Sequence, residues 1–444
     1  MEHISHLQCL ICGRQYAPEA VAYVCPEHGF EGILDVVYDY GRIAQSLSPD
    51  SLKHNPDTTI WRYKPLLPIA PDAPVPPLAV GGTPLYKADR LAQALGMQAV
   101  WLKDDGRNPT ASFKDRASAL AVVKAQEMAS GEWRVTSSES PQPPHSPVPL
   151  PPIITTASTG NAAAALAGLC ASVGQANVIF VPKSAPSAKI AQLLVFGAKV
   201  LLVDGTYDDA FDLCLQTAAH YGWYNRNTGF NPYMSEGKKT VSYEIAEQLG
   251  WQAPDVVLVS VGDGCIIGGV HKGFRDLLAL GWIERMPRLL GVQAAGSNYL
   301  AQAWENGEDV LTKSAITAQT VADSISAGLP RDRLKAMTAV TSTNGAFVTV
   351  SDAEILAAIP ALARGCGVFA EPAGAAAYAG LVKAIAQKLV DPAERVVVIN
   401  TGNGLKDIQS SMKAVEMVGT RPFPVAPRFE EVQAIVEGWH AVRA

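Results

Sequence analysis

The sequence predicts an α/β protein with mostly parallel sheets and a small cysteine-containing module at the N-terminus. Continuous apolar runs of strand length alternate with helical patterns along most of the chain. This rhythm is typical of parallel sheets that helices cover on both faces. Three of the seven cysteines lie within the first 25 residues, which sets this part apart from the remainder. The length of 444 residues suggests two or three domains.

Composition and charge exclude several classes of protein. Hydrophobic residues make up 48% of the chain and charged residues 18%, so extensive disorder is excluded. The net charge of −6 disfavours broad nucleic-acid binding, which needs clustered lysine and arginine. No apolar run reaches the roughly 20 residues of a membrane span, and the start lacks the basic and apolar regions of a secretory signal. We expect a cytoplasmic protein.

Two short pairs of metal-binding residue types stand near the N-terminus. The sequence reads C-L-I-C, then twelve residues, then C-P-E-H. Thiolate and imidazole groups at this spacing favour a tetrahedral zinc ion. The predicted ligands are Cys9, Cys12, Cys25 and His28. Four protein ligands leave no position for a substrate, so the predicted role is structural. In the alternative interpretation, His28 is a surface turn residue and the site is degenerate or empty.

A zinc module can also bind nucleic acid, but the charge of residues 1–40 argues against it. Arg14 is the only lysine or arginine in this range, beside six aspartate and glutamate residues. Such a surface repels phosphate.

The main body follows a proline-rich connector at 64–82. Six apolar runs predict strands, at 153–157, 177–182, 199–204, 256–262, 289–294 and 395–400. One segment interrupts the pattern. Residues 131–152 contain seven prolines, which a helix interior or a central strand cannot accommodate. We interpret them as a surface insertion.

The segment SVGDGCIIGG at 260–269 predicts a phosphate site. It follows a predicted strand and opens a helical pattern. Glycines let the backbone approach an anion, and amide groups at a helix N-terminus stabilise it. The glycine spacing differs from the dinucleotide fingerprint, and no Lys-Ser or Lys-Thr pair follows as in a nucleotide P-loop. The compact phosphate of a cofactor fits better.

Three further segments carry polar groups suited to chemistry. Lys114 lies in NPTASFKDR at the start of a predicted helix, where burial and the helix dipole both lower a lysine pKa, as a Schiff-base lysine requires. TASTGN at 156–161 offers hydroxyl, amide and backbone donors for a carboxylate. NTGNG at 400–404 ends a predicted strand with Thr401. Each of these segments alone also fits an ordinary turn or helix cap.

Together these segments resemble the threonine synthase family of fold-type II pyridoxal-phosphate (PLP) enzymes. The resemblance runs in order from about Gly81 to Asp407 and includes GGTPL, NPYMSEGKKT, GVQAAG and GVFAEPAGAAAYAGL. A cysteine knuckle is also found on several proteins similar to threonine synthase. The resemblance implies PLP as cofactor and conversion of O-phospho-L-homoserine and water into L-threonine and phosphate.

The resemblance also implies roles for single residues. Lys114 would hold PLP covalently, Asn161 would contact its ring hydroxyl, and Thr401 would meet its pyridine nitrogen. The implied phosphate-binding residues are Gly262, Asp263, Gly264 and Cys265. The implied substrate-binding residues are Thr83, Ser158, Thr159 and Gly160.

The family pattern also predicts the division into domains. We expect a zinc-ribbon-like module at 1–40 and a small domain at 110–228 that includes the insertion. The large PLP-binding domain would combine 41–109 with 229–444, in an arrangement like that of the tryptophan synthase β chain. PLP would lie between these two lobes. A homodimer is the default expectation for such enzymes.

Met234 stands where threonine synthases often carry an arginine that helps to bind the substrate phosphate. Methionine cannot pair with phosphate, so Arg226, Lys238 or Lys239 would have to replace that arginine. This difference keeps open a PLP-dependent threonine or serine dehydratase, or a β-replacement enzyme. A non-catalytic PLP-binding homologue is disfavoured, because Lys114, Asn161 and Thr401 are all present.

Overall fold

The computed structural model describes residues 3–130, 152–158, 160–183, 185 and 187–441. The predicted surface insertion at 131–152 lies outside these residues, apart from Pro152. The predicted ligand Thr159 lies outside them as well.

The N-terminal module contains a three-stranded antiparallel sheet. Strand β1 (Ile4–Cys9) lies between β2 (Gln15–Tyr16) and β3 (Leu34–Tyr38). The turn after β1 closes through a hydrogen bond from Gly13 N to Cys9 O at 3.0 Å, with Gly13 at a φ of +70°. Glycine adopts this left-handed conformation without the cost that other residues have. The turn thus brings the chain back on itself directly after the first predicted metal ligand.

The largest sheet has six strands in the order β12-β11-β10-β13-β5-β4. Their bounds are β4 Leu85–Lys87, β5 Ala99–Asp104, β10 Val256–Ser260, β11 Arg288–Ala294, β12 Ala346–Val350 and β13 Arg395–Asn400. Strand β10 is buried along its whole length, and its successive side chains enter two different cores. Val257 packs with residues of α10 (Cys265–Ala279), whereas Leu258 packs with residues of α14 (Pro372–Ala386). Helices therefore cover both faces of this sheet.

The smaller sheet has four parallel strands in the order β8-β7-β6-β9. Their bounds are β6 Ile154–Ala157, β7 Asn177–Pro182, β8 Lys199–Val203 and β9 Tyr224–Asn225. Helices α5 (Asn161–Ser172) and α6 (Ser187–Val195) pack on one face and α7 (Tyr207–Tyr221) on the other. Thr206 caps α7 at its start, and Gly222 ends it with a φ of +66°.

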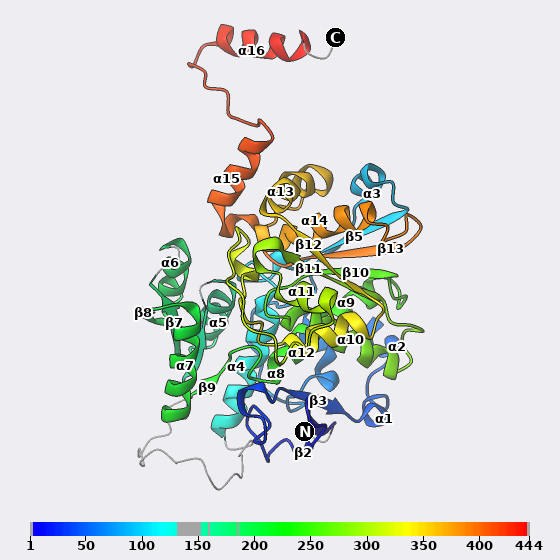
Figure 1. The fold of residues 1–444 in the computed structure, drawn as a ribbon, viewed down its shortest axis with the longest axis vertical. Coiled ribbons are helices and arrows are strands. Elements are labelled where there is room, and N and C mark those ends of the chain that lie inside the picture. The colour runs from blue at the N-terminus through cyan, green and yellow to red at the C-terminus, as the bar shows by residue number, and fades with distance from the viewer. Residues whose placement is uncertain (1–2, 131–151, 159, 184, 186, 442–444) are drawn as a thin grey trace.

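Figure 1 shows the two larger sheets in separate lobes, with the N-terminal module below the lobe of the six-stranded sheet. Helix α4 (Lys114–Ser130) lies between the lobes and packs against both α5 and α8 (Tyr233–Lys238). Among the described strands of the two larger sheets, only β4 pairs antiparallel. The predicted α/β class with mostly parallel sheets is therefore confirmed.

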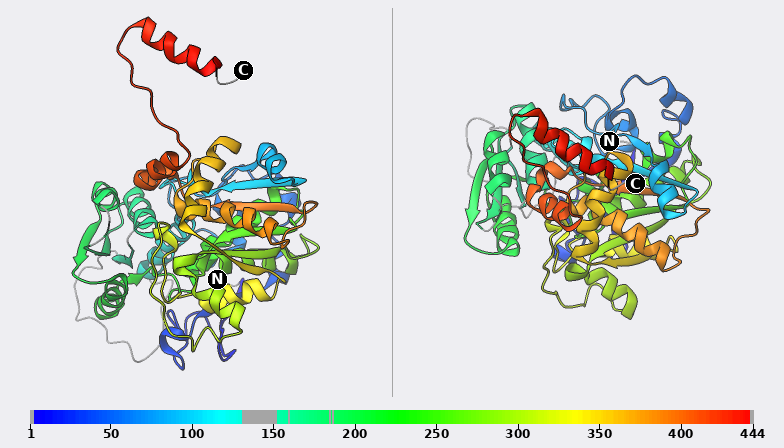
Figure 2. Two further views of the ribbon diagram at one scale, coloured as in Figure 1. Left: turned by 45° about the horizontal axis from the view of Figure 1, so that its top comes forward. Right: turned by 90° about the horizontal axis from the view of Figure 1, so that it is seen from above.

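The C-terminal region extends away from both lobes. Helix α15 (Ile408–Met417) packs on α13 (Asp352–Cys366), and residues 418–428 lead to α16 (Phe429–Ala441). Figure 1 and the left view of Figure 2 show α16 apart from the body, and no side chain from 429 to 438 is fully buried. Within the described part of the chain, none of the helices has both the length and the apolar character needed to cross a membrane.

Candidate active site

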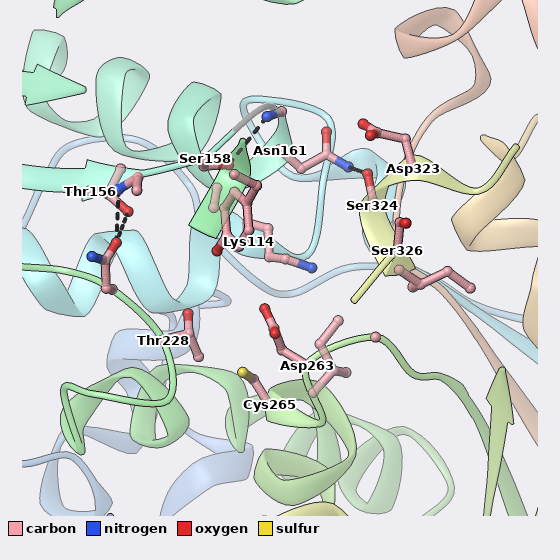
Figure 3. Close-up of a pocket in the computed structure, with 18 of the residues that line it drawn as sticks. Lys114, Thr156, Ser158, Asn161, Thr228, Asp263, Cys265, Asp323, Ser324 and Ser326 are labelled. Atoms are coloured by element: carbon pink, nitrogen blue, oxygen red, sulfur yellow. Dashed lines mark hydrogen bonds between the residues drawn. The ribbon is translucent and has the colours of Figure 1, made fainter. Parts of the chain in front are cut away.

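A cavity of about 320 Å³ lies between the two lobes, at the carboxyl ends of β6 and β10. This edge is where open α/β sheets bind small ligands. The small lobe contributes residues around Ser158 and Asn161, and the large lobe contributes residues 260–266 and 323–326. Figure 3 shows Lys114 extending into the space between these groups.

Lys114 is the first residue of α4, and the strand end beside it fixes its position. The backbone N–H of Phe113 donates to the carbonyl oxygen of Thr401 at 2.9 Å, directly after β13. Burial lowers the pKa of the Lys114 amine, and the nearby Arg226 adds to this effect. Cys265 and Glu371 oppose it. The direction agrees with the pKa predicted from the sequence, and a neutral amine can act as a nucleophile or base.

The predicted phosphate loop lies on the large-lobe side of the cavity. Gly262, Asp263, Gly264 and Cys265 all line it. Gly264 caps α10 with a φ of +88°, and a Cβ there would lie 2.8 Å from the carbonyl oxygen of Asp332. A Cβ on Gly262 would lie 2.7 Å from Cα of Ile325. A helix start at the cavity wall, in a backbone conformation that favours glycine, fits a bound phosphate.

Asp263 has its carboxylate directed toward the cavity in Figure 3. It accepts a hydrogen bond of 3.3 Å from the backbone N–H of Arg331, and burial raises its pKa. The raised pKa reduces the negative charge that this side chain would set beside a phosphate.

On the small-lobe side, the residues after β6 reach the cavity as the sequence predicted. Ser158, Gly160 and Asn161 line it, and the hydroxyl of Ser158 accepts from the backbone N–H of Gly160 at 3.2 Å. Asn161 is held from the opposite lobe. Its side-chain amide donates to the carboxylate of Glu371 at 2.6 Å and to the hydroxyl of Ser324 at 3.3 Å.

Two predicted residues are not among the described residues that line the cavity. Thr401 is buried directly after β13, where its carbonyl holds Phe113. The buried hydroxyl of Thr83 donates to Asp105 at 2.7 Å and belongs to a network around Arg116. The functional roles of both threonines remain predictions.

Two buried cations, Arg226 and Lys238, line the cavity and meet at Thr228. Both are 1% exposed, and their nitrogens lie 3.2 and 3.3 Å from the Thr228 hydroxyl. Nη2 of Arg226 has no hydrogen-bond partner among the described residues. Burial lowers the pKa of Arg226 to about 10 and that of Lys238 to about 8. Buried positive charge with an unused donor is suited to an incoming anion.

Met234 and Lys239 are not among the described residues that line the cavity. Met234 is fully buried. Lys239 forms ion pairs with Glu236 at 2.6 Å and Asp276 at 2.7 Å. Of the three cations that the sequence suggested, the structure therefore brings Arg226 and Lys238 to the cavity.

Sequence reasoning missed Glu371 and the segment 323–326. Glu371 lies within GVFAEPAGAAAYAGL, which carried the resemblance but suggested no role for the glutamate. It is 4% exposed, and burial raises its pKa. Residues 323–326 have no sequence signal, because they reach the cavity only through the packing of a loop from the large lobe.

The N-terminal module gathers the four predicted metal ligands. The Sγ and ring nitrogen atoms of Cys9, Cys12, Cys25 and His28 all lie within 4.8 Å of one another. Burial opposes ionisation of the Cys25 thiol, but hydrogen bonds from Tyr16 and His28 lower its pKa to about 6. A close set of three thiols and an imidazole is chemically suited to zinc.

Comparisons with known proteins agree with this geometry. The family model described as pyridoxal-phosphate dependent enzyme matches residues 77–402. A threonine synthase from Methanocaldococcus jannaschii is 35% identical over 411 residues, which cover 92% of this chain and 95% of that protein. A threonine synthase from Methanosarcina acetivorans is 37% identical over 412 residues, which cover 93% and 94%.

A solved structure supports the fold. The processed form of threonine deaminase isoform 2 from Solanum lycopersicum matches with a TM-score of 0.60 and 23% identity, covering 76% of this chain and 83% of that one. The predicted two-lobed PLP-enzyme fold is thus confirmed. Because the family model spans most of the chain and the two relatives span nearly all of it, this chain belongs to the family of pyridoxal-phosphate dependent enzymes.

Proposed function

We propose that this chain is a threonine synthase, which converts O-phospho-L-homoserine and water into L-threonine and phosphate. The observation that carries the proposal is the 35–37% identity to threonine synthases over more than nine-tenths of the chain. The cavity supports it, because it combines the half-buried amine of Lys114 with anion-binding groups from both lobes.

PLP, when bound, withdraws electrons from the substrate carbon that bears the amino group and so acidifies its hydrogens. In this proposal Lys114 holds the cofactor, and the loop 262–265 with the first turn of α10 binds its phosphate. Asn161 contacts the ring hydroxyl and Thr401 the pyridine nitrogen. The glycine conformations of the loop and the link from Phe113 to Thr401 support these roles.

The Lys114 amine would remove the proton from Cα of the substrate and then move a proton at Cβ. Its lowered pKa supports this role, because more of the amine is then neutral near neutral pH. Ser158, Thr159 and Gly160 would hold the α-carboxylate, and the loop of Thr83 would close over the substrate. Phosphate leaves from Cγ, which then takes up a proton to become the methyl group of threonine, and water adds at Cβ.

The substrate phosphate would be bound by Arg226 and Lys238 in place of the arginine that Met234 replaces. Nη2 of Arg226 has no hydrogen-bond partner in the described part of the chain, and both cations line the cavity, which supports this assignment. Two cations at one site suit a phosphate dianion better than a carboxylate.

We also propose that Cys9, Cys12, Cys25 and His28 hold a structural zinc ion. Their close spacing supports it. Metal analysis of the purified protein tests it, with about one zinc per chain expected. We further propose a homodimer. The side chains of residues 429–438, none of which is fully buried, support this proposal, and light scattering tests it.

The second candidate is a PLP-dependent dehydratase, which the fold of the threonine deaminase favours. Assay of the holoenzyme with L-threonine alone separates the two. Our proposal expects little 2-oxobutyrate from threonine and rapid phosphate release from O-phospho-L-homoserine. Abundant 2-oxobutyrate without phosphate release would favour the dehydratase. A protein that binds PLP and turns over neither substrate would favour a non-catalytic homologue.

A further inference from the structure

The loop that carries Cys25 packs directly against the segment that carries Arg226. Tyr23 lies two residues before Cys25, and its hydroxyl accepts a hydrogen bond from the backbone N–H of Asn225 at 3.1 Å. The Tyr23 ring lies against the ring of Phe230, with centroids 5.0 Å apart. One side chain of the cysteine module thus contacts the chain on both sides of Arg226.

A second aromatic residue of the same loop makes a similar contact. Phe30 lies two residues after His28, and its ring centroid is 5.9 Å from that of Phe230. Phe30 is 66% exposed, so it contributes little to the core of the module itself. Because Phe230 lies two residues after Thr228, the contact between Phe30 and Phe230 helps to fix the position of Thr228.

The module also holds the helix that carries Lys238. The hydroxyl of Tyr38 at the end of β3 donates to the carboxylate of Glu236 at 2.6 Å, two residues before Lys238. Asp35 in the same strand forms an ion pair of 3.2 Å with Lys272 of α10. The module therefore contacts both chain segments that bring positive charge to the cavity.

These contacts matter because a buried cation binds an anion well only when its donors are held in place. The backbone N–H of Arg226 donates to the carbonyl of Thr155 at 2.8 Å, which fixes one side of the segment. The contact from Tyr23 to Asn225 fixes the other side. Small displacements of donors from a bound group lower affinity steeply.

We infer that Tyr23 and Phe30 are positioning residues for Arg226 and Thr228, so that the metal-binding loop sets the affinity of the cavity for a phosphate group. The inference rests on the proposed function for the identity of the substrate. The chemistry it requires is that of any phosphate dianion.

The test compares Tyr23→Phe and Phe30→Ala with the wild-type holoenzyme. Tyr23→Phe removes the hydrogen-bond acceptor and keeps the ring. Because a partly buried hydrogen bond is lost, we expect roughly fivefold weaker binding of inorganic phosphate in calorimetry and a similar rise in KM for O-phospho-L-homoserine. The value of kcat and the amount of bound cofactor should stay unchanged. Phe30→Ala should shift phosphate affinity in the same direction.

Two control variants change the same residue types at exposed positions outside this contact. Tyr86, in the edge strand β4 of the larger sheet, is 39% exposed, and Phe429 in α16 is 74% exposed. Tyr86→Phe and Phe429→Ala should leave phosphate affinity and KM unchanged. Wild-type phosphate affinity in both test variants would overturn the inference, and so would a fall in kcat at unchanged KM. If Phe30→Ala does not fold, Tyr23→Phe alone decides.

Metal removal provides an independent measurement. Cys12 is exposed, so Cys12→Ser removes a proposed ligand with little effect on packing. We expect loss of zinc together with weaker binding of inorganic phosphate. Full phosphate affinity in the zinc-free variant would overturn the link to the metal-binding loop.

The phosphate titration also separates this inference from the proposed function. If the wild-type holoenzyme forms no threonine, yet Tyr23→Phe weakens phosphate binding, the proposed function fails and the inference stands. If threonine forms and phosphate affinity is the same in wild type and Tyr23→Phe, the inference fails and the proposed function stands.

Discussion

The side-chain amide of Asn161 in the small lobe donates a 2.6 Å hydrogen bond to the carboxylate of Glu371 in the large lobe. Both side chains are buried, at 6% and 4% exposure. Because Asn161 lines the cavity and Glu371 directly precedes α14, this bond ties the orientation of a proposed cofactor contact to the opposite lobe.

Replacement of Glu371 tests this orientation. Glu371→Ala leaves the buried amide of Asn161 without its carboxylate acceptor, so we expect roughly a 10- to 100-fold fall in kcat/KM. The absorbance of bound PLP should also shift, because Asn161 is proposed to contact the ring. Steady-state kinetics and a visible spectrum measure both effects. An unchanged spectrum with unchanged kinetics would contradict the role given to Glu371.

Lys114→Ala removes the proposed point of cofactor attachment and the proposed base. We expect no measurable turnover and loss of the visible absorbance of bound cofactor, with the fold preserved in circular dichroism. Retention of both turnover and absorbance would contradict the assignment of Lys114.

The phosphate loop depends on a backbone conformation that favours glycine. Gly264 has a φ of +88°, and a Cβ there would lie 2.7 Å from the Cβ of Ala336. Gly264→Ala should cost about 1–3 kcal/mol of folding stability and weaken PLP binding. Thermal unfolding and cofactor titration measure these effects. Wild-type affinity for PLP in this variant would contradict the proposed role of the loop 262–265 in binding the cofactor phosphate.

The Lys238 amine gives a pH dependence with a definite sign. Burial lowers its pKa to about 8. The amine is charged below that pH, so kcat/KM for the phosphorylated substrate should fall as pH rises through about 8. In Lys238→Arg this fall should be absent, because arginine stays charged. A wild-type profile without a decline that depends on Lys238 would contradict its role in phosphate binding.

Loss of the Lys238 proton lowers kcat/KM as pH rises, but it has the opposite effect on the free energy of unfolding. The unfolded chain holds this proton up to the ordinary lysine pKa, whereas the folded protein releases it from about 8. The unfolded state therefore binds more protons between these values, and the contribution of Lys238 to stability rises with pH in this window. Denaturant unfolding of the wild type and of Lys238→Met at pH 7 and pH 10 measures it.

Removal of a cysteine ligand tests the metal site. In Cys9→Ser, we expect the zinc content to fall from about one to near zero per chain, with a lower melting temperature. PLP absorbance should be retained, because the module does not contribute residues to the cavity within the described part of the chain. A wild-type protein without metal would contradict the zinc assignment.

The sequence was sufficient for the features that depend on local pattern. Apolar runs predicted strands such as β7 and β10, because strands buried on both faces need continuous apolar residues. Lys114, Asn161 and the loop 262–265 were found because each follows a strand or starts a helix, and all of them reach the cavity.

Features that depend on long-range packing could not be predicted in this way. The contact between Tyr23 and Asn225 joins residues 202 positions apart, and that between Asn161 and Glu371 joins residues 210 apart. Neither pair has a local signal. Arg226 and Lys238 could be named as cations, but only the packing of α8 and β9 decides that they face the cavity and that Lys239 does not.

The most direct test of the proposed function is turnover of O-phospho-L-homoserine by the holoenzyme in water enriched in oxygen-18. Phosphate that leaves from Cγ takes the bridging oxygen with it, and water adds at Cβ. We therefore predict equimolar threonine and phosphate, with the label in the threonine hydroxyl and none in the phosphate. Labelled phosphate with homoserine, or no threonine at all from a fully cofactor-loaded protein, would contradict the account.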